Sequence, residues 1–308
     1  MTTDIAIPAA PPPTAPTLIR PQRQIQPNPF REQASYSCSE IVKSYMTHRR
    51  NRNAQKKAEL EATQETVVEP LLRGIVKDGE PPEFDYRNCI TIWARPTNAV
   101  KDLAERIQAE FVRVLNPENL AGDNSLTSPT GAVVIDPADG PIWIMPRDCQ
   151  HMSLLEITHS VPPQEVDALL TRLRPNLEKI LHLDRGTTLC RPLVCFDASG
   201  VALTFVPVDN EPYTYTHLRA DIFDRVRQCV PIASRYQVPS AHIALVRFVE
   251  KITDDQVTLF LDTIDRINRE LEHSTLKWTV GSENGLSCRC GRIWYGGGWT
   301  ELVGNTID

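Results

Sequence analysis

Apolar residues along the chain follow two different periods, and together these predict a mixture of strands and helices. Segments that are apolar, or that alternate between apolar and polar residues, predict β-strands between turn residues. The predicted strands cover residues 89–96, 142–145, 150–158, 192–197, 201–208 and 242–249. Apolar residues spaced three or four apart predict helices over residues 98–115, 164–181, 215–230 and 253–271. Near the C-terminus, residues 276–281 and 291–297 predict a hairpin.

The first 85 residues lack these patterns and predict two segments outside the globular body. Residues 1–37 predict a disordered tail, because eight of the 25 prolines lie in the first 35 residues and no apolar stripe is present. We therefore expect a chain that begins near Ser39 to keep the full melting temperature. Residues 38–85 predict a polar helix and linker, whose basic residues 48–52 should face solvent rather than a nucleic acid or a membrane. The globular domain should cover residues 86–308.

Two segments of this domain resemble each other at an offset of 91 residues. Each predicts a strand that begins with a histidine and is followed by a turn and a helix. The two histidines are His151 and His242, and apolar residues also coincide, such as Leu154 with Leu245. A repeat of this kind indicates two related half-domains. If the halves face each other, both histidines reach one cleft.

Strand periodicity decides which side chains share a face, because successive residues point to opposite sides. His151 shares a face with Ser153, and His242 shares one with Ala244. The other face of each segment is apolar and should lie under the following helix. Arg247 falls on that apolar face of its strand, where we expect an ion pair with a carboxylate.

Paired imidazoles suit the hydrolysis of a phosphodiester. One neutral histidine can take a proton from water, while the other, protonated, gives a proton to the leaving oxygen. Histidine has a pKa that allows both forms near neutral pH. A hydroxyl two residues further on, such as that of Ser153, can donate a hydrogen bond to a phosphate oxygen.

Composition and charge narrow the class of partner. The chain has 308 residues, of which 41% are hydrophobic and 23% charged, with a net charge of −6. Residues 1–60 carry 9 basic and 4 acidic side chains, so the remaining 248 residues carry −11. An acidic body is a poor partner for long nucleic acids. No apolar run reaches the length of a membrane span, and no signal peptide is evident, so we expect a cytoplasmic location with no membrane partner.

The cysteines predict neither disulfides nor a metal site. None of the eight forms a Cys-x-x-Cys motif, and Cys288-Arg-Cys290 has no partner pair at the spacing of a zinc site. We therefore expect reduced thiols, no metal and no cofactor.

The histidine segments resemble a known superfamily. His151-Met-Ser153-Leu and His242-Ile-Ala244-Leu are similar to the paired H-x-[ST]-x motifs of the two-histidine (2H) phosphoesterases. The similarity is closest to fungal proteins described as RNA ligase/cyclic nucleotide phosphodiesterase-like, and it extends over roughly residues 86–304. The flanking segments that contribute are Trp93–Pro96, Leu155–Ser160, Tyr213–Arg219, Ser234–His242 and Trp294–Gly298.

The resemblance implies an α+β fold of two lobes related by duplication. Two antiparallel sheets would form a V-shaped cleft with helices outside, and each lobe would contribute one motif. The implied activity is the opening of a 2′,3′-cyclic phosphate without metal, with His151, His242 and Ser153 as catalytic residues. Ala244 departs from the motif, which requires Ser or Thr there, so one of two hydroxyl donors is missing.

Three further residues are candidates for binding the substrate, which we expect to be a small molecule. Arg219 lies where a helix begins and could bind an anion, with an ion pair on the helix as the alternative. Arg235 and Tyr236 precede the second histidine strand and could flank the cleft.

Two other functions stay open at this point. The cleft could carry out acid/base chemistry, such as isomerisation or cyclisation, on a metabolite of a fungal biosynthetic pathway, and Ala244 favours this alternative. The chain could also bind a nucleotide without turnover.

Overall fold

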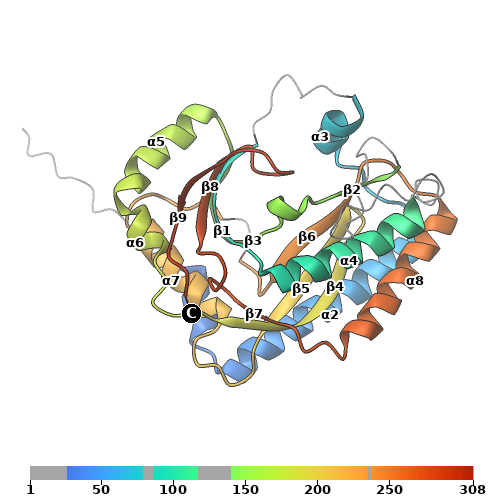
Figure 1. Ribbon diagram of the computed structural model, residues 1–308, viewed down its shortest axis with the longest axis horizontal. Helices are drawn as coiled ribbons and strands as arrows, with labels where there is room; N and C mark the ends of the chain where they lie inside the picture. The colour runs from blue at the N-terminus through green and yellow to red at the C-terminus, as the bar shows by residue number, and fades with distance from the viewer. Residues whose placement is uncertain (1–25, 79–86, 117–139, 235–236, 308) are drawn as a thin grey trace, which may run out of the picture.

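Two antiparallel β-sheets form the framework in a computed structural model that describes residues 26–78, 87–116, 140–234 and 237–307 (Figure 1). The first sheet has the order β3-β1-β8-β9, with strands at Met152–Val161, Asn88–Ala94, Ser287–Gly291 and Trp299–Val303. The second has the order β2-β6-β5-β4-β7, with strands at Ile142–Ile144, Ala241–Phe248, Gly200–Pro207, Thr188–Asp197 and Lys277–Thr279. The prediction of an α+β chain with two antiparallel sheets is therefore confirmed.

Helices cover both sheets. The two 18-residue helices α4 (Asn98–Leu115) and α8 (Asp254–Leu271) pack on each other, and both contact the second sheet (Figure 1). α5 (Pro163–Leu173) and α6 (Leu177–Leu181) contact the first sheet, and α7 (Tyr215–Arg227) contacts β3. The apolar residues that predict α4 and α8 are buried against these sheets, among them Phe111 and Phe260, whose ring centroids lie 5.5 Å apart.

One predicted helix is interrupted at a proline. Residues 164–181 form α5 and α6, with a 3₁₀ turn at Arg174–Asn176 between them. Pro175 has no N–H to donate to a carbonyl of the preceding turn, and its ring crowds that turn, so the helix is broken there.

The C-terminal hairpin prediction is wrong. β7 pairs with β4 at the edge of the second sheet, whereas β8 pairs with β1 and β9 in the first. The first segment finds its partner elsewhere in the chain, which strand patterning does not specify, and most of the second, residues 292–297, is the turn between β8 and β9. The chain between β7 and β8 therefore passes from one sheet to the other.

The N-terminal boundary is also corrected. Residues 1–25 lie outside the described residues, but residues 26–37 pack on the body. Phe30, in α1 (Pro29–Ala34), is fully buried with its ring centroid 5.9 Å from that of Phe223. The Asn28 side chain donates to the carbonyl of Ala220. A chain that begins near Ser39 would lose these contacts, contrary to the expectation that it keeps its melting temperature.

The polar helix predicted after this tail is part of the body as well. α2 (Cys38–Thr63) begins with a capping box at Ser37 and Glu40, and it lies across β4 and β5. The short α3 (Pro70–Arg73) follows, with a turn of π-helix at Gly74–Asp78. α2 therefore packs on the second sheet and is not a free linker.

Candidate active site

His151 and His242 reach the same cavity from the two different sheets. His151 directly precedes β3 and His242 is the second residue of β6, and these two strands contact each other. Both histidines, with Ser153 and Ala244, line a cavity of about 310 Å³. This volume is at the lower end of the roughly 300–1,000 Å³ typical of ligand sites. The prediction that strand parity turns both histidines toward one cleft agrees with this placement.

A β-bulge interrupts each of the two histidine strands at the last residue of the histidine motif. In the first sheet, Ile92 pairs with Leu155 and Trp93 with Ser153, so Leu154 is an extra residue. In the second sheet, Val201 pairs with Val246 and Ala202 with Ala244, so Leu245 is the extra residue. The two extra leucines are 91 positions apart in the sequence, and both are fully buried.

These bulges turn two charged residues toward the histidines. An extra residue reverses the alternation of a strand, so the residues beyond it exchange faces. Glu156 and Arg247 thereby line the same cavity as His151 and His242. The expectation that Arg247 lies on the apolar face is wrong for this reason, and its guanidinium donates to Ser199 Oγ at 2.8 Å. Sequence reasoning missed both residues as part of the site.

The imidazole of His151 is held on one edge and one face. Its Nδ1 lies 2.7 Å from the carbonyl oxygen of Cys149, and since a carbonyl only accepts, Nδ1 carries the hydrogen. In the neutral ring, Nε2 then has the free lone pair. The ring also stacks on the Trp93 indole, with centroids 3.5 Å apart and planes at 7°. The ring is therefore a fixed proton acceptor.

Burial and nearby cations keep His151 uncharged. Burial is the main cause that lowers its pKa from 6.5 to about 3, with a smaller contribution from Arg95 and Arg289. These two guanidiniums lie over the Trp93 ring, 4.8 and 5.0 Å from its centroid. The imidazole is thus neutral at pH 7.

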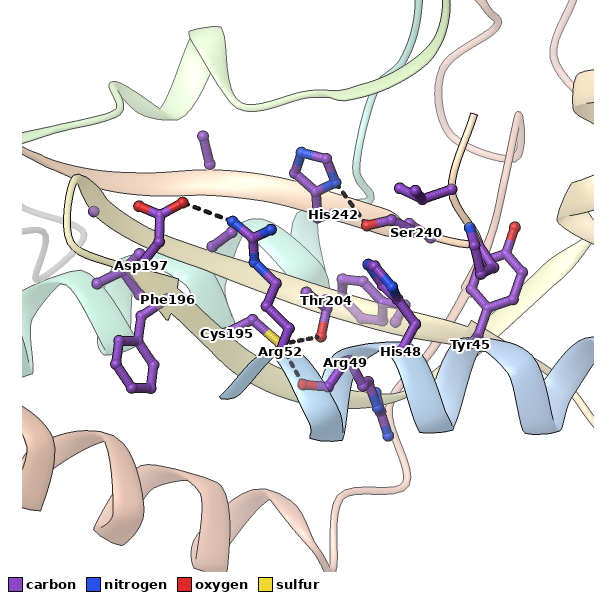
Figure 2. Close-up of a pocket in the computed structure, with 18 of the residues that line it drawn as sticks. Tyr45, His48, Arg49, Arg52, Cys195, Phe196, Asp197, Thr204, Ser240 and His242 are labelled. Carbon is purple, nitrogen blue, oxygen red and sulfur yellow. Dashed lines mark hydrogen bonds and ion pairs between the residues drawn. The ribbon is translucent and has the colours of Figure 1, made fainter. Parts of the chain in front are cut away.

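The Nδ1 of His242 is also engaged by a neighbour, in this case a hydroxyl. This nitrogen lies 3.0 Å from Ser240 Oγ, a hydroxyl that can donate or accept, so either ring nitrogen can carry the proton (Figure 2). Burial is the main cause that lowers the pKa of His242 from 6.5 to about 4, with smaller contributions from the cations Arg247 and Arg52. Both imidazoles are therefore neutral at pH 7.

Aromatic side chains line much of the cavity. Trp93, Trp143, Trp294 and Tyr295 all face it, and the rings of Trp143 and Tyr295 meet edge to face at 5.5 Å. Trp294 and Tyr295 belong to the turn between β8 and β9, in which Gly296 and Gly298 have positive φ. The glycine-rich segment is therefore a turn, and two of its side chains line the cavity.

One of the three remaining sequence candidates is placed away from the cavity. Arg219 is buried, with its guanidinium donating to the carbonyls of Leu154 and Val238 and stacked over Phe30. It does not line the cavity, and the expectation that it binds the substrate is corrected: its donors and its ring contact join α7 to β3 and α1. Arg235 and Tyr236 lie outside the described residues.

Other features of the described residues bear on ligands and partners. They contain no group of three or more His, Cys, Asp or Glu side chains placed to hold a metal ion. All eight cysteines are free thiols. Within the same ranges, no helix is long and apolar enough to cross a bilayer. Comparison with known proteins finds no matching family model and no matching curated sequence.

Proposed function

We propose that the chain is a metal-independent phosphodiesterase that opens a small cyclic phosphate, with His151 as general base and His242 as general acid. The observation that carries this proposal is the shared cavity, in which two neutral imidazoles stand with the Nδ1 of each engaged by a neighbour. The cationic side chains that act on the pair favour an anionic ligand.

Each step uses a group already described. His151 Nε2 takes a proton from a water molecule, whose oxygen forms a bond to phosphorus. The bond between phosphorus and one ribose oxygen breaks, and that oxygen receives a proton from His242. The Ser153 hydroxyl donates a hydrogen bond to a non-bridging phosphate oxygen as its charge grows. The products are a phosphate monoester, a charged His151 and a neutral His242, which exchange protons with water before the next turnover.

The bilobal architecture belongs to this proposal. Four pairs of residues recur at the same offset of 91 positions. They are the two histidines, Ser153 with Ala244, the two buried leucines, and Glu156 with Arg247. This equivalence supports two duplicated lobes that form a V-shaped cleft with one motif on each side. The aromatic walls would hold the ring of a nucleotide by stacking.

A second function is favoured by specific features of the same cavity. Glu69 and Glu156 line it together with Arg247, and Ala244 offers no hydroxyl. Carboxylates beside paired imidazoles suit acid/base chemistry on an uncharged metabolite, such as an isomerisation or a cyclisation. In this alternative, the small side chain of Ala244 would contact an apolar part of the ligand.

The first prediction concerns the histidine pair. Adenosine 2′,3′-cyclic phosphate should be hydrolysed in the presence of EDTA, and His151→Asn or His242→Asn should each reduce kcat/KM by about 10²–10⁴-fold, because proton transfer is lost. His273→Asn is the control, since His273 is exposed and does not line this cavity. Equal rates for the wild type and both histidine variants would contradict the assignment.

The second prediction follows from the pKa values. The base, His151, is neutral and can accept a proton above about pH 3, whereas the acid, His242, is mostly charged only below about pH 4. Above pH 4, the fraction with protonated His242 falls about tenfold for each pH unit, and kcat/KM should fall with it. The pH profile of kcat/KM from pH 5 to 7 measures this slope. A profile that is flat or rises with pH would show that His242 is not the acid.

The third prediction concerns Ala244. If the cavity binds a phosphate, Ala244→Ser should add a hydrogen-bond donor and raise hydrolysis of the cyclic phosphate by at most about 10²–10³-fold, while Ser153→Ala lowers it. If the cavity serves an uncharged metabolite, the new hydroxyl meets an apolar contact and impairs the native reaction instead. Initial rates of both variants on adenosine 2′,3′-cyclic phosphate separate these two cases. Absence of turnover in the wild type and both variants would overturn the proposed phosphodiesterase activity.

A further inference from the structure

A second cavity of about 200 Å³ adjoins the first at the acid histidine (Figure 2). His242, Ala244 and Arg247 line both cavities. The opposite wall is α2, the helix that precedes the region of 2H resemblance, and Figure 2 shows His48 and Arg52 projecting from it toward His242. The two cavities therefore meet at His242, Ala244 and Arg247.

The sequence predicts that the basic residues 48–52 of α2 face solvent, but they do not all do so. Tyr45 lies three and four positions before His48 and Arg49, and Arg52 lies four and three positions after them. The four residues therefore share one face of the helix, and all of them line the cavity. Arg50 is exposed and does not line it. The basic cluster is thus split between a cavity wall and an exposed surface.

Positive charge exceeds negative charge in this second cavity. Its described lining holds Arg49, Arg52 and Arg247 but a single carboxylate, that of Asp197. Arg49 turns away from His242 and donates to the carbonyl of Arg191 at 2.6 Å (Figure 2). Arg52 and Arg247 remain as the two guanidiniums near His242.

These two guanidiniums share the one carboxylate. Arg52 pairs with Asp197 at 2.6 Å, and Arg247 reaches Asp197 only through Ser199, whose hydroxyl donates to that carboxylate at 2.6 Å. The side chain of Arg52 is 44% exposed, and an ion pair of such exposure is weak. A phosphate could therefore bind Arg52 in competition with Asp197, since guanidinium groups bind phosphate oxygens in pairs.

We propose that this second cavity is an anion subsite that holds a second phosphate of the substrate, with Arg52 and Arg247 as its ligands. The inference rests on the proposed function and narrows its substrate class to a nucleotide that carries a second phosphate besides the cyclic one. The reacting phosphate lies between His151 and His242, and the second lies beyond His242, against α2. Arg247 faces both positions because it lines both cavities.

The test compares the binding of two stable nucleotides by titration calorimetry. Adenosine 2′-phosphate represents a ring-opened product, and adenosine 2′,5′-bisphosphate adds the second phosphate. The wild type should bind the bisphosphate at least about tenfold more tightly than the monophosphate, as expected for added charge-assisted hydrogen bonds. Arg52→Gln should bring this ratio close to one, whereas Arg50→Gln, the same change on the exposed face of α2, should leave it unchanged.

A further variant tests the competition with the carboxylate. Asp197→Asn keeps the shape of the side chain and removes its charge, so the ratio of bisphosphate to monophosphate affinity should rise. If Arg50→Gln reduces the ratio of bisphosphate to monophosphate affinity as much as Arg52→Gln does, the subsite is overturned. The effect would then come from the overall charge of the protein.

Failure of the subsite and failure of the proposed function give different results. If the monophosphate binds but the second phosphate adds no affinity in the wild type, the subsite alone is overturned. If neither nucleotide binds any variant, both the subsite and the phosphodiesterase fall. If the bisphosphate binds through Arg52 while the cyclic phosphate is not hydrolysed, the subsite stands and the proposed reaction does not.

Discussion

The fixed position of the His151 imidazole is the constraint on which the rest of the site depends. Stacking on Trp93 sets the plane of the ring, and the bond from Nδ1 to the Cys149 carbonyl sets its tautomer. Only the second nitrogen is then left for chemistry, and burial keeps it unprotonated near neutral pH. The Nδ1 of His242 contacts the Ser240 hydroxyl, which can donate or accept, so this contact leaves the tautomer of His242 open. The different surroundings of two identical side chains thus separate a base from an acid.

The two β-bulges give this pair its charged neighbours. Without the extra residues Leu154 and Leu245, the alternation of each strand would direct Glu156 and Arg247 into the core. With them, both strands keep a buried apolar face under the helices while a charged side chain turns toward the cavity. Arg247 then joins the histidine cavity to the cavity beside α2.

The sequence predicts the residues before each bulge and fails for those after it. His151, Ser153, His242 and Ala244 lie where strand periodicity puts them, because alternation is undisturbed up to these positions. A bulge leaves no signal in the composition. However, Glu156 and Arg247 are charged residues at equivalent positions of the repeat, and simple alternation would put both on an apolar face. That coincidence could have indicated the bulges. Phe30 is a similar case, because one apolar residue does not stand out in a proline-rich segment. Its burial depends on contact with Phe223, which is distant in the sequence.

The protonation state of His151 is the most direct test of this account. Two-dimensional ¹H–¹⁵N NMR of the ¹⁵N-labelled chain reports the tautomer and the pKa of each imidazole, with His151→Asn to assign the signals. The account predicts that His151 stays neutral with the proton on Nδ1 from pH 7 down to about pH 4, while its pKa lies near 3. A His151 that carries its proton on Nε2, or that is charged at pH 6, would contradict it.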